Sequence, residues 1–251
     1  MARKYAEKDI KLLWARSFGM CAFPNCRKLL IEGSTGVDDA VTLGEMAHIE
    51  AYSKKGPRAN PSLPSEKRNS YENLILLCAH HHNLVDKQPN SYTVDDLRKW
   101  KSDHEAWIIH RLTTQMPRVS FSELEIITKA LLQVPLEPTS QFAHIDPLQK
   151  MQRNSLTPNV HFLITVGLSK FGEVQKYIQK MALIDVQFPE RLKMGFLAEY
   201  HALREQGLEG DVLFESLRDF TVQKNRDDFT KQAAGLAVLV YYFHTCEVFE
   251  K

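Results

Sequence analysis

Hydrophobic residues recur at helical spacing in several parts of the chain and form short apolar runs in two others. Residues 5–18 carry apolar side chains three to four positions apart, which predicts a helix. Residues 41–50 and 73–78 are short and apolar, which favours two strands. From Thr93, which with Asp96 forms a capping box, we expect a second helix with one apolar face.

The pattern changes in the second half of the chain. Five of the eleven prolines fall between residues 117 and 158, which predicts an inter-domain connector with some local structure. Residues 160–251 follow helical spacing, and 231–249 are apolar on nearly all sides, so the last helix must be buried in a bundle or against another chain. The predicted organisation is an N-terminal domain (1–112), a Pro-rich connector (113–158) and a helical docking or oligomerisation domain (159–251).

The composition is that of an ordinary globular protein. The chain is 43% hydrophobic and 25% charged, with 32 Lys and Arg against 31 Asp and Glu. These values exclude a wholly disordered chain, a collagen-like repeat and a disulfide scaffold. The start does not read as a signal peptide, and the most apolar stretch is far shorter than the ~20 residues of a membrane span. We therefore expect a cytoplasmic protein.

Cysteine and histidine spacing indicates a metal site. Cys21-x4-Cys26 and Cys78-x2-His81 are two pairs, each on a segment short enough to direct both side chains at one ion. Four nitrogen and sulfur ligands are typical of a structural zinc site, and clustered cysteines in a reducing compartment bind metal more often than they form disulfides. The alternative is a set of buried free thiols beside a solvated histidine run. Cys246 is expected to be a small core residue.

A second set of polar residues stands around the same strands. His48 ends the motif Gly-Glu-Met-Ala-His, and Asn73 and His82 flank the run Leu-Ile-Leu-Leu-Cys. Here the sequence resembles the HNH endonucleases, in which two strands and a helix form a ββα-metal site. With a Gly-Pro-Arg loop and a closing Leu-x-x-Trp-Lys, the motifs are similar to the HNH modules of bacterial antiphage effectors over about residues 10–107.

The resemblance implies metal-dependent hydrolysis of DNA phosphodiester bonds. His48 is the candidate base for water, because an imidazole titrates near neutral pH, and the family implies that Asn73 orients it. His82 is the candidate ligand for a catalytic divalent ion such as Mg, Mn or Ni. Many HNH enzymes carry a further ligand where this chain has Ala47, so Glu45, on the same strand face, is the second candidate ligand.

The loop over residues 53–70 is basic, with one acid and five cations: Lys54, Lys55, Arg58, Lys67 and Arg68. These are candidate DNA-backbone contacts, and an ordinary solvated loop is the alternative. Three other polar residues nearby are assigned non-catalytic roles. Asn69 is expected in a turn, His80 in solvent, and His104 on the apolar face of its helix.

The C-terminal pattern, which ends in Tyr-Phe-x-x-Cys-Glu-Val-Phe-Glu, resembles a module of effectors in ABC-ATPase-type three-component defence systems. That resemblance implies docking onto a complex with an ATPase and a small adaptor, and a helical homo-oligomerisation domain is the alternative. The predicted fold class is α+β: a zinc-stapled ββα-metal HNH domain followed by a mainly α-helical domain. The expected partners are DNA and such a complex or a second copy, with no membrane. The rival function is a catalytically inactive zinc module that binds DNA or protein.

Overall fold

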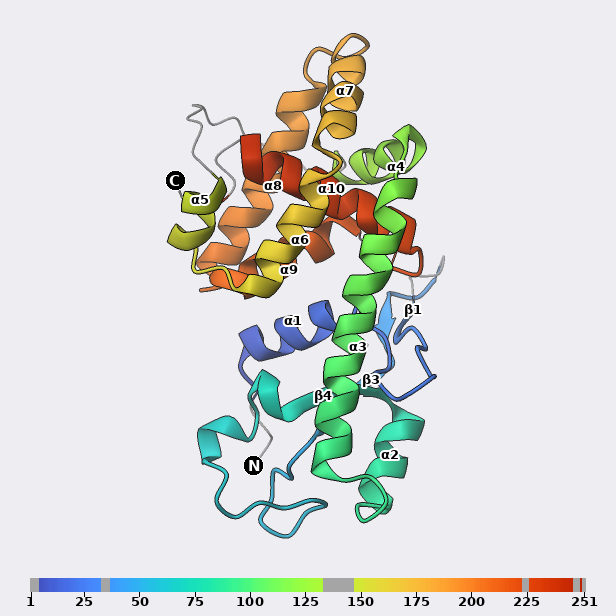
Figure 1. Cartoon of the computed structure of the whole chain (residues 1–251), viewed down its shortest axis with the longest axis vertical. Helices are drawn as coiled ribbons and strands as arrows, with labels where there is room; N and C mark the ends of the chain where they lie inside the picture. The colour runs from blue at the N-terminus through green and yellow to red at the C-terminus, as the bar shows by residue number, and fades with distance from the viewer. Residues whose placement is uncertain (1–4, 33–36, 133–146, 223–225, 246–248, 250–251) are drawn as a thin grey trace. The chain divides into compact units, whose positions relative to one another are not determined.

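The computed structural model describes residues 5–32, 37–132, 147–222, 226–245 and 249. The chain divides into two compact units, residues 1–108 and 109–251 (Figure 1). The elements of the first unit are α1 (Glu7–Arg16), β1 (Ile31–Glu32), β2 (Val41–Thr42), β3 (Gly44–His48), the 3-10 helices η1 (Ser65–Lys67) and η2 (Tyr71–Asn73), β4 (Leu74–Cys78), α2 (Ala79–Lys87) and the start of α3 (Val94–Gln115).

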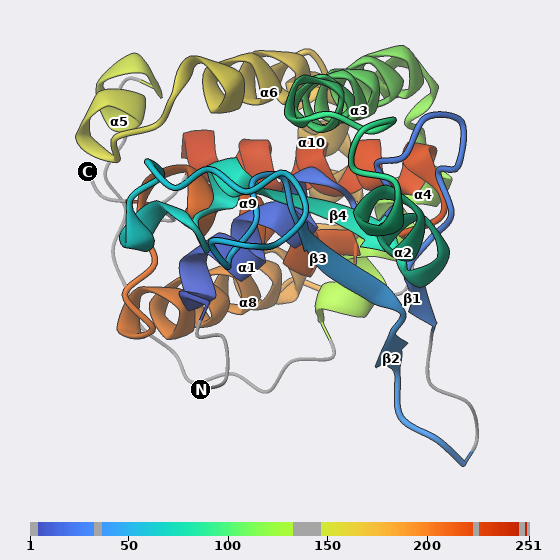
Figure 2. The same cartoon turned by 90° about the horizontal axis from the view of Figure 1, so that it is seen from below.

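The centre of the first unit is an antiparallel pair of strands followed directly by a helix. β3 pairs with β4 from Gly44 opposite Cys78 to His48 opposite Leu74. The chain enters α2 immediately after β4, so α2 lies against the strand pair (Figure 2). The predicted strands and the ββα arrangement are present, and the long loop between residues 49 and 73 joins the two strands at the His48 end.

Fully buried side chains hold the helices to this strand pair. Leu13 of α1, Val85 of α2 and Leu97 of α3 join one apolar cluster with the core of β4, which consists of Leu74, Ile75, Leu76 and Leu77. Continuous burial explains why β4 reads as an unbroken apolar run rather than an alternating one.

The predicted capping box at the start of α3 is confirmed. The backbone N–H of Asp96 donates to Thr93 Oγ1 over 3.2 Å, and the backbone N–H of Thr93 donates to Asp96 Oδ2 over 2.9 Å. The two bonds satisfy donors that a helix start otherwise leaves open.

The second unit is helical in the part that the structure describes. After α3 its elements are η3 (Met116–Arg118), α4 (Phe121–Leu131), α5 (Pro147–Arg153), α6 (Pro158–Leu168), α7 (Phe171–Ala182), α8 (Phe188–Glu205), α9 (Gly210–Val222) and α10 (Phe229–Thr245). α10 packs against α4, α6, α7 and α9 (Figure 1). Its residues Ala233–Val240 are all buried.

The apolar last helix is therefore buried inside its own bundle. Of the two predicted possibilities, burial in a bundle or against another chain, the structure shows the first. The close packing depends on small residues: a Cβ at Gly235 would lie 2.3 Å from Oγ1 of Thr221 on α9. Only glycine lets the two helices approach so closely here.

The local structure expected in the connector over residues 113–158 is present as a helix, and this helix belongs to the second unit. Residues 121–131 form α4, whose Leu124, Ile127 and Leu131 are buried in the second unit. The prolines that suggested a linker are compatible with helices, since three of the five stand in the first turn of η3, α5 and α6. Proline is favourable there because the first turn needs no N–H donor. The stretch 133–146 lies outside the described residues, as does Cys246.

Among the described helices, none combines the length and the apolar character that crossing a bilayer requires.

Candidate functional site

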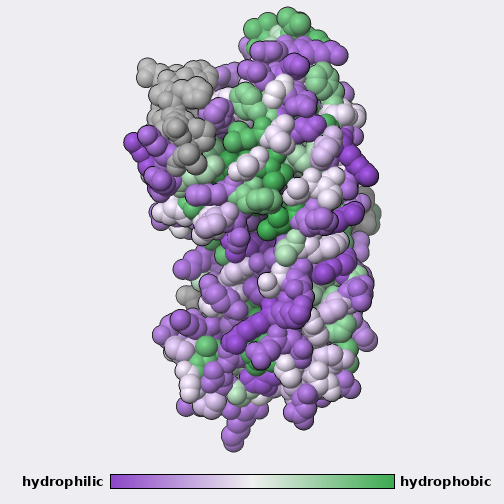
Figure 3. Space-filling model, viewed as in Figure 1, coloured by the Kyte–Doolittle hydropathy of each residue, from purple (hydrophilic) through white to green (hydrophobic). Residues whose placement is uncertain are grey.

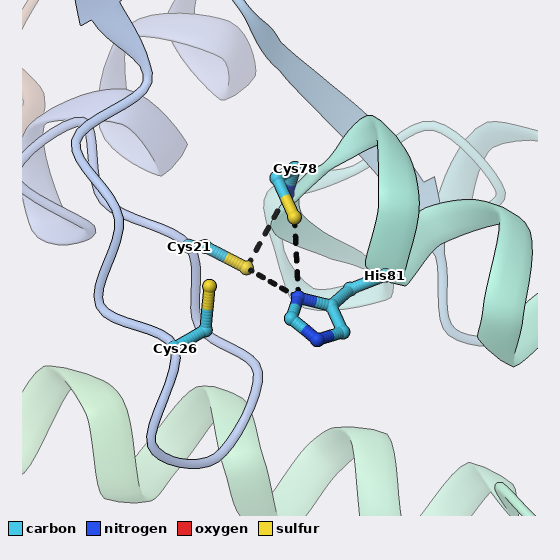
Figure 4. A group of neighbouring side chains, drawn as sticks. All are labelled: Cys21, Cys26, Cys78 and His81. Atoms are coloured by element: carbon cyan, nitrogen blue, oxygen red, sulfur yellow. Dashed lines mark hydrogen bonds between the residues drawn. The ribbon is translucent and has the colours of Figure 1, made fainter.

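Three cysteines and one histidine converge in the first unit. Cys21 and Cys26 stand on the turn after α1, Cys78 ends β4, and His81 lies in the first turn of α2 (Figure 4). Their ligand atoms all lie within 4.8 Å of one another. Sγ of Cys78 is 3.1 Å from Nδ1 of His81, and Sγ of Cys21 is 3.6 Å from the same nitrogen. We call this set the Cys3His cluster.

The local fold explains the convergence. The turn between Cys21 and Cys26 is tight because Asn25 adopts a left-handed φ of 62° and Cys26 N–H donates to Phe23 O. Ala22 N–H donates to Leu76 O over 2.9 Å and ties the turn to β4. The ring of Phe23 stacks on the imidazole of His81, with 3.8 Å between the ring centroids and 6° between the ring planes. This stacking fixes the direction of the imidazole.

The donor set fits a zinc ion. Burial raises the pKa of the Cys21 thiol to about 12, and burial lowers the pKa of His81, which keeps its imidazole neutral and able to ligate. A bound cation reverses the thiol shift because the thiolate is the ligand. These three cysteines are free thiols. Three thiolates and one imidazole around one point form a closed site that could bind zinc.

His48 ends β3 and is only 7% exposed. Its Nε2 lies 2.9 Å from Oδ1 of Asn69. Because an amide oxygen only accepts hydrogen bonds, Nε2 carries the ring proton and Nδ1 carries the lone pair. The rings of Tyr5 and Tyr52 lie beside the imidazole, with centroids 5.9 and 5.8 Å away. His48 is therefore a buried, oriented histidine whose Nδ1 is the basic nitrogen.

The orienting contact corrects the sequence-based assignment of Asn73. The side-chain amide of Asn73 forms hydrogen bonds only with backbone groups in these contacts. Its Oδ1 accepts from Glu50 N–H, and its Nδ2 donates to Glu50 O and to Arg68 O, each over 2.9 Å. Asn73 thus fastens the two ends of the 49–73 loop. Asn69, which was assigned to a turn, holds His48 instead.

His82 lies between two carboxylates. Its Nδ1 contacts Oε2 of Glu45, and its Nε2 is 3.4 Å from Oδ2 of Asp86, one turn further along α2. The hydrogen bond to Asp86 raises the pKa of His82. Burial lowers this pKa, and the contact with Glu45 raises it, so the net shift is upward. The structure thus brings the two candidate ligands Glu45 and His82 together, while Ala47 is fully buried. It adds Asp86, which the sequence analysis missed although the i, i+4 spacing from His82 was visible.

The candidate base His48 and the candidate ion ligand His82 share one small pocket. His48, His82 and Asp86 line it together with Tyr52 and the turn that contains Gly56, and its volume is about 50 Å³. That is room for a few water molecules.

The five loop cations divide into two groups. Lys54, Lys55 and Lys67 are exposed. The guanidinium of Arg68 is buried and donates to four backbone carbonyls, those of Ala51, Tyr52, Asn60 and Leu63. The side chain of Arg58 is 3% exposed and equally engaged. The proposed DNA contacts are accordingly reduced to the three lysines, because both arginines are structural.

His80 and His104 lie where the sequence predicted, in solvent and on the apolar face of a helix. His80 is exposed, and His104 is fully buried. Nε2 of His104 donates to Ser17 O over 3.1 Å, and the guanidinium of Arg27 contacts Nδ1. Burial lowers the pKa of His104 to about 4, so its ring is neutral and structural.

Comparison with known proteins agrees with this geometry. Residues 30–88 match the family model of an HNH endonuclease. The match spans β3, β4 and α2, and so includes His48, Asn73 and His82. The first unit therefore contains a region similar to HNH endonuclease domains, and this similarity supports a nuclease, a hydrolase acting on nucleic acid. No curated protein matches the chain.

Proposed function

We propose that the protein is a metal-dependent endonuclease that hydrolyses phosphodiester bonds of DNA. The observation that carries this proposal is the shared pocket, which is lined both by His48, oriented by Asn69, and by His82 of α2. The domain match supports the same reaction class. The Cys3His cluster holds one structural zinc ion, which staples the turn after α1 to β4 and α2.

The residues of the pocket have separate tasks in the reaction. His48 takes a proton on Nδ1 from the attacking water as the water oxygen bonds to phosphorus. The bond from phosphorus to the 3′ oxygen breaks, and that oxygen takes a proton from solvent. Asn69 keeps Nε2 protonated, so that Nδ1 stays the acceptor. His82 and Glu45 would hold a divalent ion, which when bound would supply positive charge for the phosphate and for the leaving oxygen.

Asp86 completes the ligand arrangement. It faces Nε2 of His82, which leaves Nδ1, the nitrogen beside Glu45, as the ligand atom. Histidine ligands of metals usually donate their second ring N–H to a carboxylate or carbonyl, and this contact fixes the ring. Lys54, Lys55 and Lys67 contribute contacts to the DNA backbone on either side of the reacting phosphate.

Cleavage of supercoiled plasmid DNA tests the proposal. Purified protein with added Mg, Mn or Ni is expected to nick or linearise the plasmid, and EDTA is expected to abolish cleavage, because the catalytic ion is open and exchangeable. Zinc content measured after the EDTA treatment shows whether the Cys3His cluster kept its metal. Binding of DNA without cleavage under every metal would instead establish the inactive zinc module, and cleavage of RNA alone would reassign the substrate.

We further propose that the nuclease works in the cytoplasm as the effector of a bacterial antiphage defence system, docked through its second unit. The resemblance of the C-terminal pattern supports an ATPase-containing partner. The second unit also exposes three apolar side chains between α7 and α8, Leu183, Ile184 and Val186, which are 88, 76 and 85% exposed (Figure 3). Exposed apolar patches of this kind mark interaction sites.

Charge substitution on this turn separates docking from folding. The triple change of Leu183, Ile184 and Val186 to Asp is expected to abolish co-purification with partner proteins from the native host, or self-association, because an aspartate desolvates poorly. The melting temperature should change little, since the three side chains are already in solvent. A variant that assembles like the parent would contradict docking at this turn.

A further inference from the structure

Arg58 occupies an unusual place in the first unit. Its backbone has a φ of +55°, in the left-handed region that residues other than glycine and asparagine rarely adopt. Its side chain is 3% exposed, although it belongs to a basic loop. Strained residues of this kind persist only where surrounding contacts over-determine them, and they gather at functional sites.

One side of the Arg58 guanidinium binds the end of β3. Nη2 donates to His48 O over 3.2 Å, and Nε donates to Ile49 O over 3.0 Å. The strand pair ends here, at the register position where His48 stands opposite Leu74. Arg58 thus fixes the backbone that carries the proposed base.

The other side of the guanidinium binds the end of α2. Nη1 donates to Val85 O, and Nη2 donates to Oδ1 of Asp86, both over 2.6 Å. The carbonyl of Val85 would normally accept from the residue four positions on, which is Pro89 and has no N–H. Arg58 replaces that missing donor, and its positive charge suits the C-terminal end of the helix.

We infer that Arg58 is a positioning residue that sets the distance between His48 and His82. One buried guanidinium joins the backbone of His48 to Asp86, and Asp86 in turn faces Nε2 of His82. The inference rests on the proposed nuclease reaction, because it gives that reaction its geometry.

Replacement of Arg58 by Lys tests the inference, since Lys keeps the charge and loses the planar fork that reaches several acceptors at once. R58K is expected to lower kcat for DNA cleavage by about 10–100-fold, the usual cost of losing a group that orients a ligand, with little change in KM. In proton–nitrogen correlation spectra of the histidine rings, the signals of both His48 and His82 should shift in the same variant.

Arg27 offers a matched control. It also has a left-handed φ, of 52°, and its guanidinium contacts His104 and lies 4.7 Å from the ring of Trp107, on α3. R27K should therefore shift the ring signal of His104 and leave those of His48 and His82 in place. Its zinc content and its kcat are expected to stay within about twofold of the parent, since the contacts described for the Arg27 guanidinium are with His104 and Trp107 of α3.

The outcomes for R58K test the positioning role of Arg58 separately from the proposed nuclease activity. Unchanged kcat and unchanged His48 and His82 signals in R58K would overturn the positioning role. If R58K does not fold, D86N, which removes the ion pair at a half-exposed carboxylate, must shift the ring signal of His48 as well as that of His82 for the role to stand. If the parent protein cleaves no DNA under any metal, the nuclease proposal fails, whereas the ring signals still show whether Arg58 links the two histidines.

Discussion

Replacing His48 with alanine is expected to lower the rate constant of DNA cleavage by about 10²–10⁴-fold, the usual contribution of a positioned general base. The substitution removes Nδ1, the only ring nitrogen that the contact with Asn69 leaves basic. It removes no member of the Cys3His cluster. The measurement is the initial rate of plasmid nicking at saturating divalent ion, together with the zinc content and the melting temperature.

Two further variants make this result specific. His110→Ala removes an exposed histidine from α3 and should cut DNA at the parent rate. Asn69→Ala keeps the imidazole and loses its orientation, so cleavage should fall less than in His48→Ala and more than in His110→Ala. Cleavage by His48→Ala at the parent rate would remove His48 from the mechanism.

Replacing Cys78 with serine is expected to leave the first unit without zinc and without cooperative thermal unfolding. Structural zinc ions contribute apparent binding free energies of about 10–16 kcal/mol in small domains, whereas whole domains are stable by only about 5–15 kcal/mol. Cys78 also ends β4, so its loss affects the strand pair directly. Metal analysis of the purified variant and circular dichroism during heating measure both effects.

The neighbouring histidines provide the control for the zinc site. His81 points Nδ1 at two of the sulfurs, and His80 is exposed and belongs to no ligand set among the described residues. His81→Ala should therefore lose zinc, and His80→Ala should keep about one zinc per chain. A parent protein that is folded and contains no zinc would disprove the assignment outright.

Local patterns in the sequence predicted the parts of the site whose spacing is short. Cys78 and His81 are one helical turn apart, and Cys21 and Cys26 flank one tight turn, so the approach of the two ligands within each pair follows from local geometry. The capping box at Thr93 is equally local. These features depend on backbone conformation over a few residues, which the sequence determines strongly.

Residues whose role depends on the path of the 49–73 loop escaped the sequence analysis. Asn69 and Asn73 have the same side chain and lie four positions apart at the end of this loop. Only the folded loop shows that Asn69 is the one that contacts His48. The charge of Arg58 likewise suggested a DNA contact, although the loop turns its guanidinium inward. Residue type alone does not reveal burial when long-range hydrogen bonds satisfy a charged group.

The central position of α10 has a consequence for the order of events during synthesis. Every element of the ββα centre lies before residue 88, whereas the bundle of the second unit cannot close until residues 229–245 have been made. At about 5–20 residues per second, the ribosome needs roughly 7–30 seconds for the intervening chain. The nascent protein therefore passes through a period in which the nuclease centre can fold and take up metal while its helical partner unit is still incomplete.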